Sequence, residues 1–360
     1  MNSSVIEFLS FGKTTYLVLY LIGIISVIAV QIFNEPKALQ DRKRPVYVLT
    51  LFLALFLFWR IGWLPIGYGV SYDRENYSWQ FNAISQYGIL DTKEHDYILG
   101  YIMLIASHFG DVKTFFILQA ALYVGLYYFV CTRLVKNNSF WLLLGCALSF
   151  GFISYGINTL RAGLAVAFLL MGLTYQKSLW KELIFFFLAV GTHFSMSIPI
   201  IMILISKYYP RTKLFFLLWI LSIPVSFIAG HFFNNLFAEF TEDSRREYLT
   251  TATSTIYNVG FRIDFILYSM LPFAIGYYYI FVRGFKDKLY VNLYNAYILT
   301  NIFWILVIRA NFSDRFAYLS WFMIPFILLY PLLKDGKVVN NATNWLSLII
   351  LGETAFLYLF

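Results

Sequence analysis

Charge is scarce in this 360-residue chain. Only 13% of the residues are charged, whereas 60% are hydrophobic. A soluble domain is roughly half apolar and about a quarter charged, so the composition excludes an ordinary soluble protein. Apolar runs of membrane-spanning length recur from end to end, and runs such as 16–33 and 46–59 lack the alternation of barrel strands. We therefore predict an all-α, polytopic transmembrane helical bundle in which residues 1–360 form a single integral membrane domain.

Cysteine and histidine are also scarce. Cys131 and Cys146 both lie in or at apolar runs, which favours two buried small side chains over a disulfide framework or a zinc site. The four histidines show no metal-ligand spacing, and the sequence contains no HExxH, GxSxG, P-loop or GxGxxG motif. We therefore expect no metal and no cofactor. The net charge of +8 fits basic cytoplasmic loops better than nucleic acid, which we do not expect as a partner.

About ten runs are long enough to be full spans, since crossing a bilayer takes about 20 apolar residues. They cover residues 15–33, 46–66, 114–132, 140–156, 161–175, 214–232, 262–282, 291–308, 316–333 and 345–360. Two further apolar segments are too short to cross alone. Residues 97–109 predict a juxtamembrane helix, and residues 182–206 predict a re-entrant helical pair.

Lysine and arginine orient the chain, because cytoplasmic loops carry an excess of both. The loop 34–45 is strongly basic and is placed in the cytoplasm. A single crossing at 182–206 would put one of its two flanking basic loops outside, which is why we prefer a re-entrant pair there. Two sizeable outer segments result: a first outer loop, 67–112, which includes the juxtamembrane helix, and a second outer loop, 233–261, expected to be partly helical.

Four arginines are predicted at or near the outer ends of spans: Arg161, Arg262, Arg309 and Arg315. Guanidinium holds phosphate oxygens bidentately and keeps its charge. A charge near lipid depth is costly, so it is a functional candidate. The alternative is that these side chains reach to the outer headgroups or pair with Asp264 and Asp314. Four at one depth favour an anionic ligand.

The first outer loop carries Asp73 and Glu75 among the aromatic residues Tyr72, Tyr77 and Trp79. A carboxylate there could accept a proton from a sugar hydroxyl, although an ordinary interfacial loop with a local ion pair remains open. Glu94, His95 and Asp96 precede the short apolar segment, where negative charge at the N-terminus is expected to stabilise the helix.

His193 lies in Gly191-Thr192-His193-Phe194-Ser195, where the 182–206 segment breaks. Irregular backbone at membrane depth persists only inside protein or beside a wet cavity. A histidine at such a break could shuttle protons or hydrogen-bond phosphate, or it could be structural. Both interpretations stay open on the sequence.

Several ordered segments resemble the EpsG family and the related Wzy-type O-antigen and capsule polymerases of bacteria. They run over most of the chain and comprise residues 72–77 (YDRENY), 158–165 (NTLRAGLA), 192–195 (THFS), 261–265 (FRIDF) and 313–316 (SDRF). An acidic residue in the first outer loop is also similar to membrane glycosyltransferases of the C superfamily, in which an Asp lies near acceptor or donor. Asp73 matches that position only by following a span, and an extra span precedes it here.

The resemblance implies polymerisation of oligosaccharide repeat units carried on undecaprenyl pyrophosphate, at the periplasmic or outer face of the bacterial cytoplasmic (inner) membrane. The implied partners are those lipid-linked glycans and membrane lipid, together with flippase and chain-length regulator proteins. In this hypothesis a hydroxyl of one glycan attacks the anomeric carbon of another and polyprenyl pyrophosphate leaves.

The catalytic candidates are Asp73, His193 and Arg161, and either Asp73 or His193 would deprotonate the hydroxyl. The expected ligands of pyrophosphate and glycan are Arg161, Arg262, Arg309, Arg315, Tyr77 and Asp264. Three alternatives remain: a flippase or transporter for lipid-linked oligosaccharide, a glycosyltransferase that uses a sugar on polyprenyl phosphate, and a membrane O-acyltransferase. A transporter would need interrupted helices in both halves, and the acyltransferase would need a histidine earlier than His95.

Overall fold

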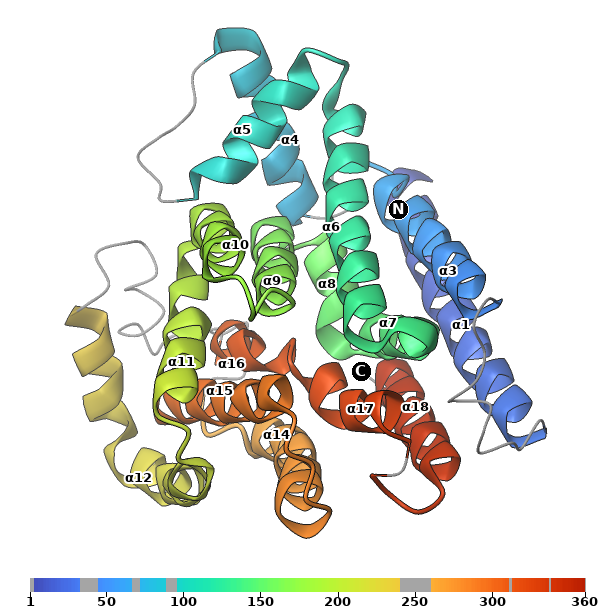
Figure 1. Ribbon diagram of the computed structural model, residues 1–360. Coiled ribbons are helices and arrows are strands. Elements are labelled where there is room, and N and C mark those ends of the chain that lie inside the picture. The colour runs from blue at the N-terminus through green and yellow to red at the C-terminus, as the bar shows by residue number, and fades with distance from the viewer. Residues whose placement is uncertain are drawn as a thin grey trace. The chain divides into compact units, whose positions relative to one another are not determined.

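The computed structural model is built from helices throughout the part of the chain that it describes (Figure 1). The described residues are 3–32, 45–66, 72–88, 96–239, 260–310, 313–336 and 338–359. Most of the predicted second outer loop therefore lies outside them, as do residues 67–71, Glu94 and His95. The helical class predicted from the composition is confirmed for the described residues.

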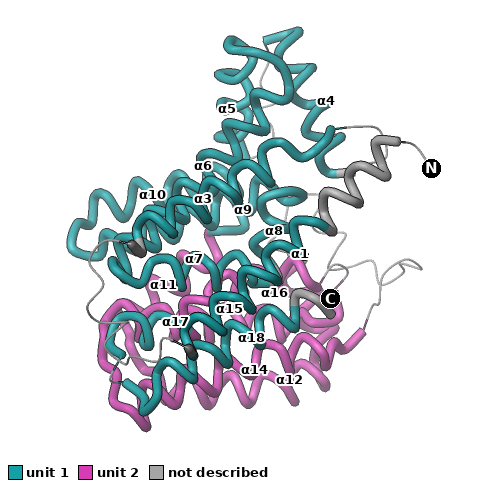
Figure 2. Tube along the Cα trace, turned by 90° about the vertical axis from the view of Figure 1, so that its right-hand side faces the viewer, with its two compact units in different colours: residues 1–196, 329–360 teal, residues 197–328 magenta. Residues whose placement is uncertain are grey.

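The chain divides into two compact units, coloured separately in Figure 2. Unit 1 comprises residues 1–196 and 329–360, and unit 2 comprises residues 197–328. Helix α17 (Ile324–Lys334) crosses the boundary between them. This division does not test the prediction of a single membrane domain, because one membrane domain can hold two helical bundles.

Unit 1 is a bundle centred on α6, a long helix whose neighbours are α3, α5, α7 and α9. In the same unit α1 packs along α18. Its helices are α1 (Ser3–Ile32), α3 (Pro45–Gly62), α4 (Tyr72–Tyr87), α5 (Tyr97–Ser107), α6 (Val112–Val135), α7 (Ser139–Leu148), α8 (Phe150–Ile157), α9 (Leu160–Leu173), α10 (Leu179–Thr192) and α18 (Ala342–Leu359), with short 3-10 turns η1 (Lys136–Asn138) and η2 (Phe194–Met196).

Unit 2 is organised around α15 (Lys288–Leu306), which packs against α11, α12 and α16. Tyrosine hydroxyls of α15 donate to backbone carbonyls on other elements: Tyr290 to Ile327 and Tyr297 to Ser269. Buried polar groups need such partners, so these bonds fix the rotation of α15. The other elements of the unit are α11 (Ser197–Tyr208), α12 (Thr212–Glu239), α14 (Ile263–Tyr277), the π-helical turn η3 (Tyr278–Val282) and α16 (Ser313–Trp321).

Among the residues that the structure describes, five helical stretches are long and apolar enough to cross a membrane, by length and composition. They are 14–31, 112–148, 212–237, 263–282 and 313–334. Other apolar helices are shorter than a bilayer span, among them α9 and α5. The short helix expected at 97–109 is present as α5, whereas the count of about ten full spans stays a prediction.

Two breaks interrupt apolar runs of unit 1. The run predicted as one span at 140–156 is split between α7 and α8 at Ser149, whose backbone is extended (ψ 145°). The Ser149 hydroxyl donates a hydrogen bond to the Cys146 carbonyl at 2.6 Å. The predicted break at His193 is confirmed: α10 ends at Thr192, and His193 is extended (φ −154°, ψ 110°). Helix α11, beyond that break, belongs to unit 2, so the re-entrant arrangement of 182–206 stays a prediction.

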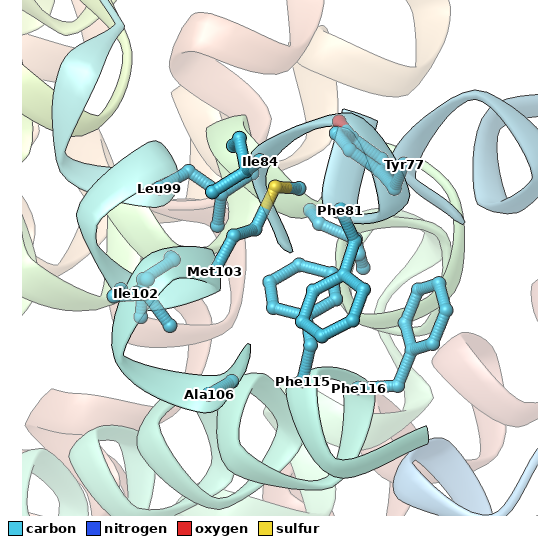
Figure 3. Packing of buried hydrophobic residues seen from close by; sticks show 11 residues of the cluster. Tyr77, Phe81, Ile84, Leu99, Ile102, Met103, Ala106, Phe115 and Phe116 are labelled. Atoms are coloured by element: carbon cyan, nitrogen blue, oxygen red, sulfur yellow. The ribbon is translucent and has the colours of Figure 1, made fainter. Parts of the chain in front are cut away.

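A buried apolar cluster fixes α4 and α5 on α6 (Figure 3). Tyr77, Phe81 and Ile84 project from one face of α4 toward side chains of α5, and Phe81 stacks on Phe115 of α6 with ring centroids 6.0 Å apart. α4 itself is polar overall, so only this inward face belongs to the core. The cluster therefore holds α4 and α5 against α6.

Candidate functional site

Asp96 lies directly before α5, at the position where a helix cap was expected. Its side chain makes no capping hydrogen bond. The expected stabilisation of the helix end by its negative charge stays a prediction. The side chain of Asp96 is only 1% exposed. A buried carboxylate needs partners to offset its desolvation, and Asp96 finds them on two other helices.

Those partners are Arg161, His193 and the backbone of Phe194. Arg161 Nη1 lies 3.2 Å from Asp96 Oδ2, and His193 Nδ1 lies 3.0 Å from the same oxygen. The Phe194 N–H donates to Asp96 Oδ1 at 2.8 Å. We call Asp96, Arg161 and His193 the Asp96 cluster. The Arg161 and His193 side chains are 31% and 21% exposed, so the buried carboxylate holds a guanidinium and an imidazole that each remain partly accessible.

Local backbone explains why these three side chains meet. Arg161 occupies the first turn of α9, which follows the break at Asn158 and Thr159. His193 and Phe194 occupy the break after α10, where an extended residue turns the Phe194 N–H toward Asp96. Helix ends leave such N–H groups without a helical acceptor, and the carboxylate supplies one.

One glycine permits a close approach that the cluster requires. A Cβ at Gly163 would collide with the Tyr155 carbonyl oxygen and lie 2.8 Å from the Tyr155 carbonyl carbon, so only glycine lets the first turn of α9 pass α8 without a backbone shift. Gly163 lies two residues after Arg161 and thereby helps to set its position. At Gly191, two residues before His193, the nearest atoms to an added Cβ are the ends of the Ile98 and Tyr97 side chains, which can move aside.

Tyr77 and Asp73 of α4 border the cluster. Burial raises the pKa of Tyr77, while the charge and hydrogen bonds of Arg161 act to lower it and the charge of Asp73 acts to raise it. Tyr77 is therefore in electrostatic contact with both. Arg74, on the same helix, is buried with its guanidinium 3.9 Å above the Phe116 ring and bonded to the Leu64 carbonyl. That anchor holds α4 on α6.

The electrostatics keep Asp96 ionised. Burial alone would raise the pKa of Asp96, but the hydrogen bond from His193, the positive charge of His193 when it is protonated, the hydrogen bond from the Phe194 N–H and the positive charge of Arg161 lower it to about 2. An ionised carboxylate only accepts hydrogen bonds, so the proton of His193 sits on Nδ1. Nε2 is then the ring nitrogen that can take up a proton, and the imidazolium formed would be stabilised by Asp96.

The remaining predicted ligands belong to unit 2. Arg262 pairs with Asp264 through two hydrogen bonds, one of them 2.9 Å from Nε to Oδ1, and its guanidinium lies 3.7 Å from the Phe265 ring centroid. Both Arg262 and Arg315 act electrostatically on Asp314. For Arg262, the structure therefore shows the pairing with Asp264 that the sequence analysis gave as the alternative to an anionic ligand.

Arg309, the fourth predicted arginine, donates from Nη2 to the Phe227 carbonyl at 3.3 Å, and its guanidinium lies 5.7 Å from the Phe227 ring centroid. Of the predicted site residues, the structure thus brings Asp73, Tyr77, Arg161 and His193 together in unit 1. It adds Asp96, which the sequence reasoning missed.

Within the described residues, no three His, Cys, Asp or Glu side chains are grouped as metal ligands would be. Independently of that, a histidine ring can transfer a proton and a guanidinium can bind an anion.

The sequence model of the EpsG family matches residues 46–360. No match was found among curated proteins or among solved structures. The matched region contains every helix of the Asp96 cluster and nearly the whole helical bundle. The resemblance recognised in the sequence is thereby confirmed, and the chain belongs to the EpsG family.

Proposed function

We propose that this protein polymerises oligosaccharide repeat units carried on undecaprenyl pyrophosphate, by glycosyl transfer at the outer face of the bacterial cytoplasmic membrane. Membership of the EpsG family supports a polysaccharide polymerase-like role in a membrane. The observation that carries the proposal is the buried Asp96 carboxylate, which holds a histidine ring and a guanidinium side by side. Glycosyl transfer from a pyrophosphate donor needs one group of each kind.

His193 is the base in this proposal. A hydroxyl oxygen of the acceptor glycan attacks the anomeric carbon of the donor, and its proton passes to His193 Nε2. Asp96 fixes the tautomer through Nδ1 and stabilises the imidazolium. The bond between the anomeric carbon and the pyrophosphate oxygen breaks, and its electron pair leaves with the pyrophosphate. Asp73, beside Tyr77, orients the acceptor hydroxyl, and Tyr77 contributes to glycan binding.

Arg161 stabilises the leaving group. Pyrophosphate gains negative charge as the glycosidic bond breaks, and fixed positive donors in a site of low dielectric are most effective there. A guanidinium has five N–H donors. Arg161 can therefore pair with Asp96 through Nη1 and still donate hydrogen bonds to phosphate oxygens from its other N–H groups. Arg262, Arg309, Arg315 and Asp264 stay predicted ligands of pyrophosphate or glycan.

For the architecture we propose a bundle like that of C-superfamily glycosyltransferases, with about ten spans and a re-entrant pair at 182–206. The five long apolar stretches supply half of these. The shorter apolar helices, such as α9 and α5, support the idea that other segments enter the membrane as broken or partial spans.

Deletion of the gene, followed by gel analysis of the surface polysaccharide, tests the function. A polymerase predicts that the ladder collapses to one repeat unit. Loss of every unit from the outer face would instead indicate a flippase. A glycosyltransferase that uses a sugar on polyprenyl phosphate would leave a ladder whose repeat unit lacks one sugar.

Complementation of the deletion tests the site. His193→Ala should leave a single repeat unit at normal protein level. His108→Ala is the matched control, because His108 is an exposed histidine of unit 1 whose Nδ1 only meets the Leu104 carbonyl of its own turn. A full ladder from His193→Ala would refute the assigned base.

A further inference from the structure

The outward face of α4 is a second surface with a distinct chemistry. Trp79 is 59% exposed and Tyr87 is 67% exposed, although both lie on a helix that is anchored in the core by its other face (Figure 3). Four exposed amide side chains accompany them: Asn76, Gln80, Asn82 and Gln86. We call these six residues the α4 stripe.

The stripe follows from helical spacing. Its residues 76, 79, 80, 82, 86 and 87, together with the exposed Ala83, recur at intervals of three and four, which places them on one side of a helix. Tyr77, Phe81 and Ile84 occupy the opposite side and are buried. Ala83 lies one turn from Trp79 and one turn from Tyr87, and its small side chain completes the surface between them.

No charged residue occurs between positions 76 and 87. An exposed helix face ordinarily carries lysine and glutamate, so a face of amides and aromatic rings is unusual. Amides each present both donors and an acceptor, which matches hydroxyl groups that donate and accept. Tryptophan and tyrosine add rigid contact area at a low cost in conformational entropy. This combination suits the hydroxyl-rich edges and C–H faces of an uncharged sugar.

A lipid surface fits the stripe less well. Helices that lie in a membrane interface present large aliphatic and aromatic side chains on one face and cationic ones on the other. The stripe has neither an aliphatic side chain larger than alanine nor a lysine or arginine. Burying its four amides in lipid without hydrogen-bond partners would cost free energy at each.

The stripe is continuous with the candidate site. Asp73 precedes Asn76 and Tyr77 by three and four residues, so it stands one turn away on the edge between the stripe and the buried face. Tyr77 interacts with both Asp73 and Arg161. A saccharide chain lying along the stripe would therefore lead to the Asp96 cluster.

We propose that the α4 stripe is a glycan-binding surface, which holds uncharged sugar residues of the saccharide beyond the one that reacts. The inference rests on the proposed function, since it concerns sugar residues of the same substrate that lie away from the glycosidic bond being formed. Binding these residues would keep the growing polysaccharide on the protein between additions. It would therefore set how many repeat units are added before the product is released.

The direct test measures binding. The probe is a set of oligosaccharides, one to several repeat units long, cut from the parent strain's own surface polysaccharide and added to the purified full-length protein. We expect Trp79→Ala to weaken binding by about tenfold, the effect typical of losing one central aromatic contact, and Trp79→Tyr to restore most of it. Trp180→Ala is the matched control, because Trp180 of α10 is 78% exposed but lies outside the stripe.

A labelling experiment separates glycan from lipid and protein. Cys131 and Cys146 are buried, so a cysteine introduced at Ala83 reports the stripe while Trp79 and Gln80 remain. We expect Ala83→Cys to react with an impermeant maleimide and the oligosaccharide to slow that reaction. Ser85→Cys, exposed on another side of α4, should react without protection. A cysteine at 83 that does not react, or that reacts unchanged with oligosaccharide present, overturns the proposal; the first result indicates coverage by lipid or by another protein.

The length of the polysaccharide made in cells distinguishes a failure of the α4 stripe proposal from a failure of the proposed function on which it rests. Trp79→Ala should shorten the polysaccharide ladder without abolishing it, whereas His193→Ala should abolish it. An unchanged ladder from Trp79→Ala beside a lost ladder from His193→Ala refutes the stripe alone. A full ladder in the deletion strain refutes the proposed function, and the binding measurement then still decides whether the stripe takes a glycan.

Discussion

His193 Nδ1 and Asp96 Oδ2 lie 3.0 Å apart, although the two residues are 97 positions apart in the chain. The contact joins the break after α10 to the start of α5. Because the carboxylate is buried and ionised, it dictates which ring nitrogen of His193 carries the proton. This pair is therefore the place to begin testing the site.

Replacing the carboxylate by its amide should lower activity by more than it lowers folding. Asp96→Asn keeps the shape but loses the negative charge that stabilises the imidazolium and pairs with Arg161. General-base catalysis contributes about 10²–10⁴-fold, so we expect polymerisation to slow by about a hundredfold. The measurement is polysaccharide chain length against time, normalised to protein level. Asp111→Asn, an exposed carboxylate that caps α6, is the control; equal effects of the two changes would mean that Asp96 is merely structural.

The same carboxylate predicts how stability depends on pH. Its pKa is about 2 in the folded protein, below the roughly 3.9 of an unfolded aspartate. The group therefore contributes fully to stability above pH 4, and that contribution, on the order of 2 kcal/mol, is lost as the pH falls from about 4 to about 2. Thermal unfolding of the purified protein should show this loss, and Asp96→Asn should show less of it. Identical pH profiles of the two proteins would contradict the assigned ion pair.

Part of this arrangement could be predicted from the sequence and part could not. The helical class and the break at His193 follow from local patterns, because a polar Gly-Thr-His-Phe-Ser segment interrupts an apolar run. The place of Asp96 in the cluster could not be predicted, because its partners Arg161 and His193 lie far away in the chain and the residues next to Asp96 indicate only the start of a helix. The split at Ser149 was missed for a related reason. Residues 140–156 are apolar apart from Ser149 and Ser154, and an isolated serine in an apolar run does not itself predict a break.

Gly163→Ala should disturb Arg161 from a distance of two residues. The new Cβ would collide with the Tyr155 carbonyl oxygen and lie 2.8 Å from the Tyr155 carbonyl carbon, so the start of α9 must shift relative to α8. That shift lengthens the contact between Arg161 and Asp96, and we expect shorter polysaccharide at an unchanged protein level. Gly125→Ala is the matched control, because a Cβ there meets nothing within 4 Å and alanine favours helix by up to about 1 kcal/mol. A full-length ladder from Gly163→Ala would show that the close approach is not needed for activity.

The arrangement of 182–206 has its own test. A re-entrant pair places Lys181 and Lys207 on the same side of the membrane, whereas a single crossing places them on opposite sides. Reporters of sidedness fused after each position should therefore agree, and we expect both to report the cytoplasm. Opposite signals would make this segment an ordinary span interrupted at His193, which would leave the Asp96 contact in place but change its predicted depth.

The guanidinium groups offer the sharpest chemical distinction. Lysine keeps the positive charge of arginine but loses the planar fork that holds two phosphate oxygens at once. Arg161→Lys should therefore slow polymerisation by about tenfold or more while the protein still inserts, and alanine should be as harmful or worse. Arg133→Lys is the control in the same unit, since Arg133 is bonded to Thr174 and lies over the Tyr175 ring.

The same substitution sorts the arginines of unit 2. Two N–H groups of the Arg262 guanidinium already donate hydrogen bonds to the Asp264 carboxylate. A pyrophosphate would therefore have to displace that carboxylate or bind beside it. If Arg262, Arg309 and Arg315 hold pyrophosphate, their lysine variants should each shorten the ladder. If they only anchor helix ends, lysine should substitute without loss, because an anchor needs charge and length but no fork. Full-length polymer from all four lysine variants, Arg161→Lys included, would refute the proposal that these arginines bind pyrophosphate. A defect confined to Arg161→Lys would restrict leaving-group stabilisation to unit 1, where Asp96 holds that guanidinium beside the proposed base.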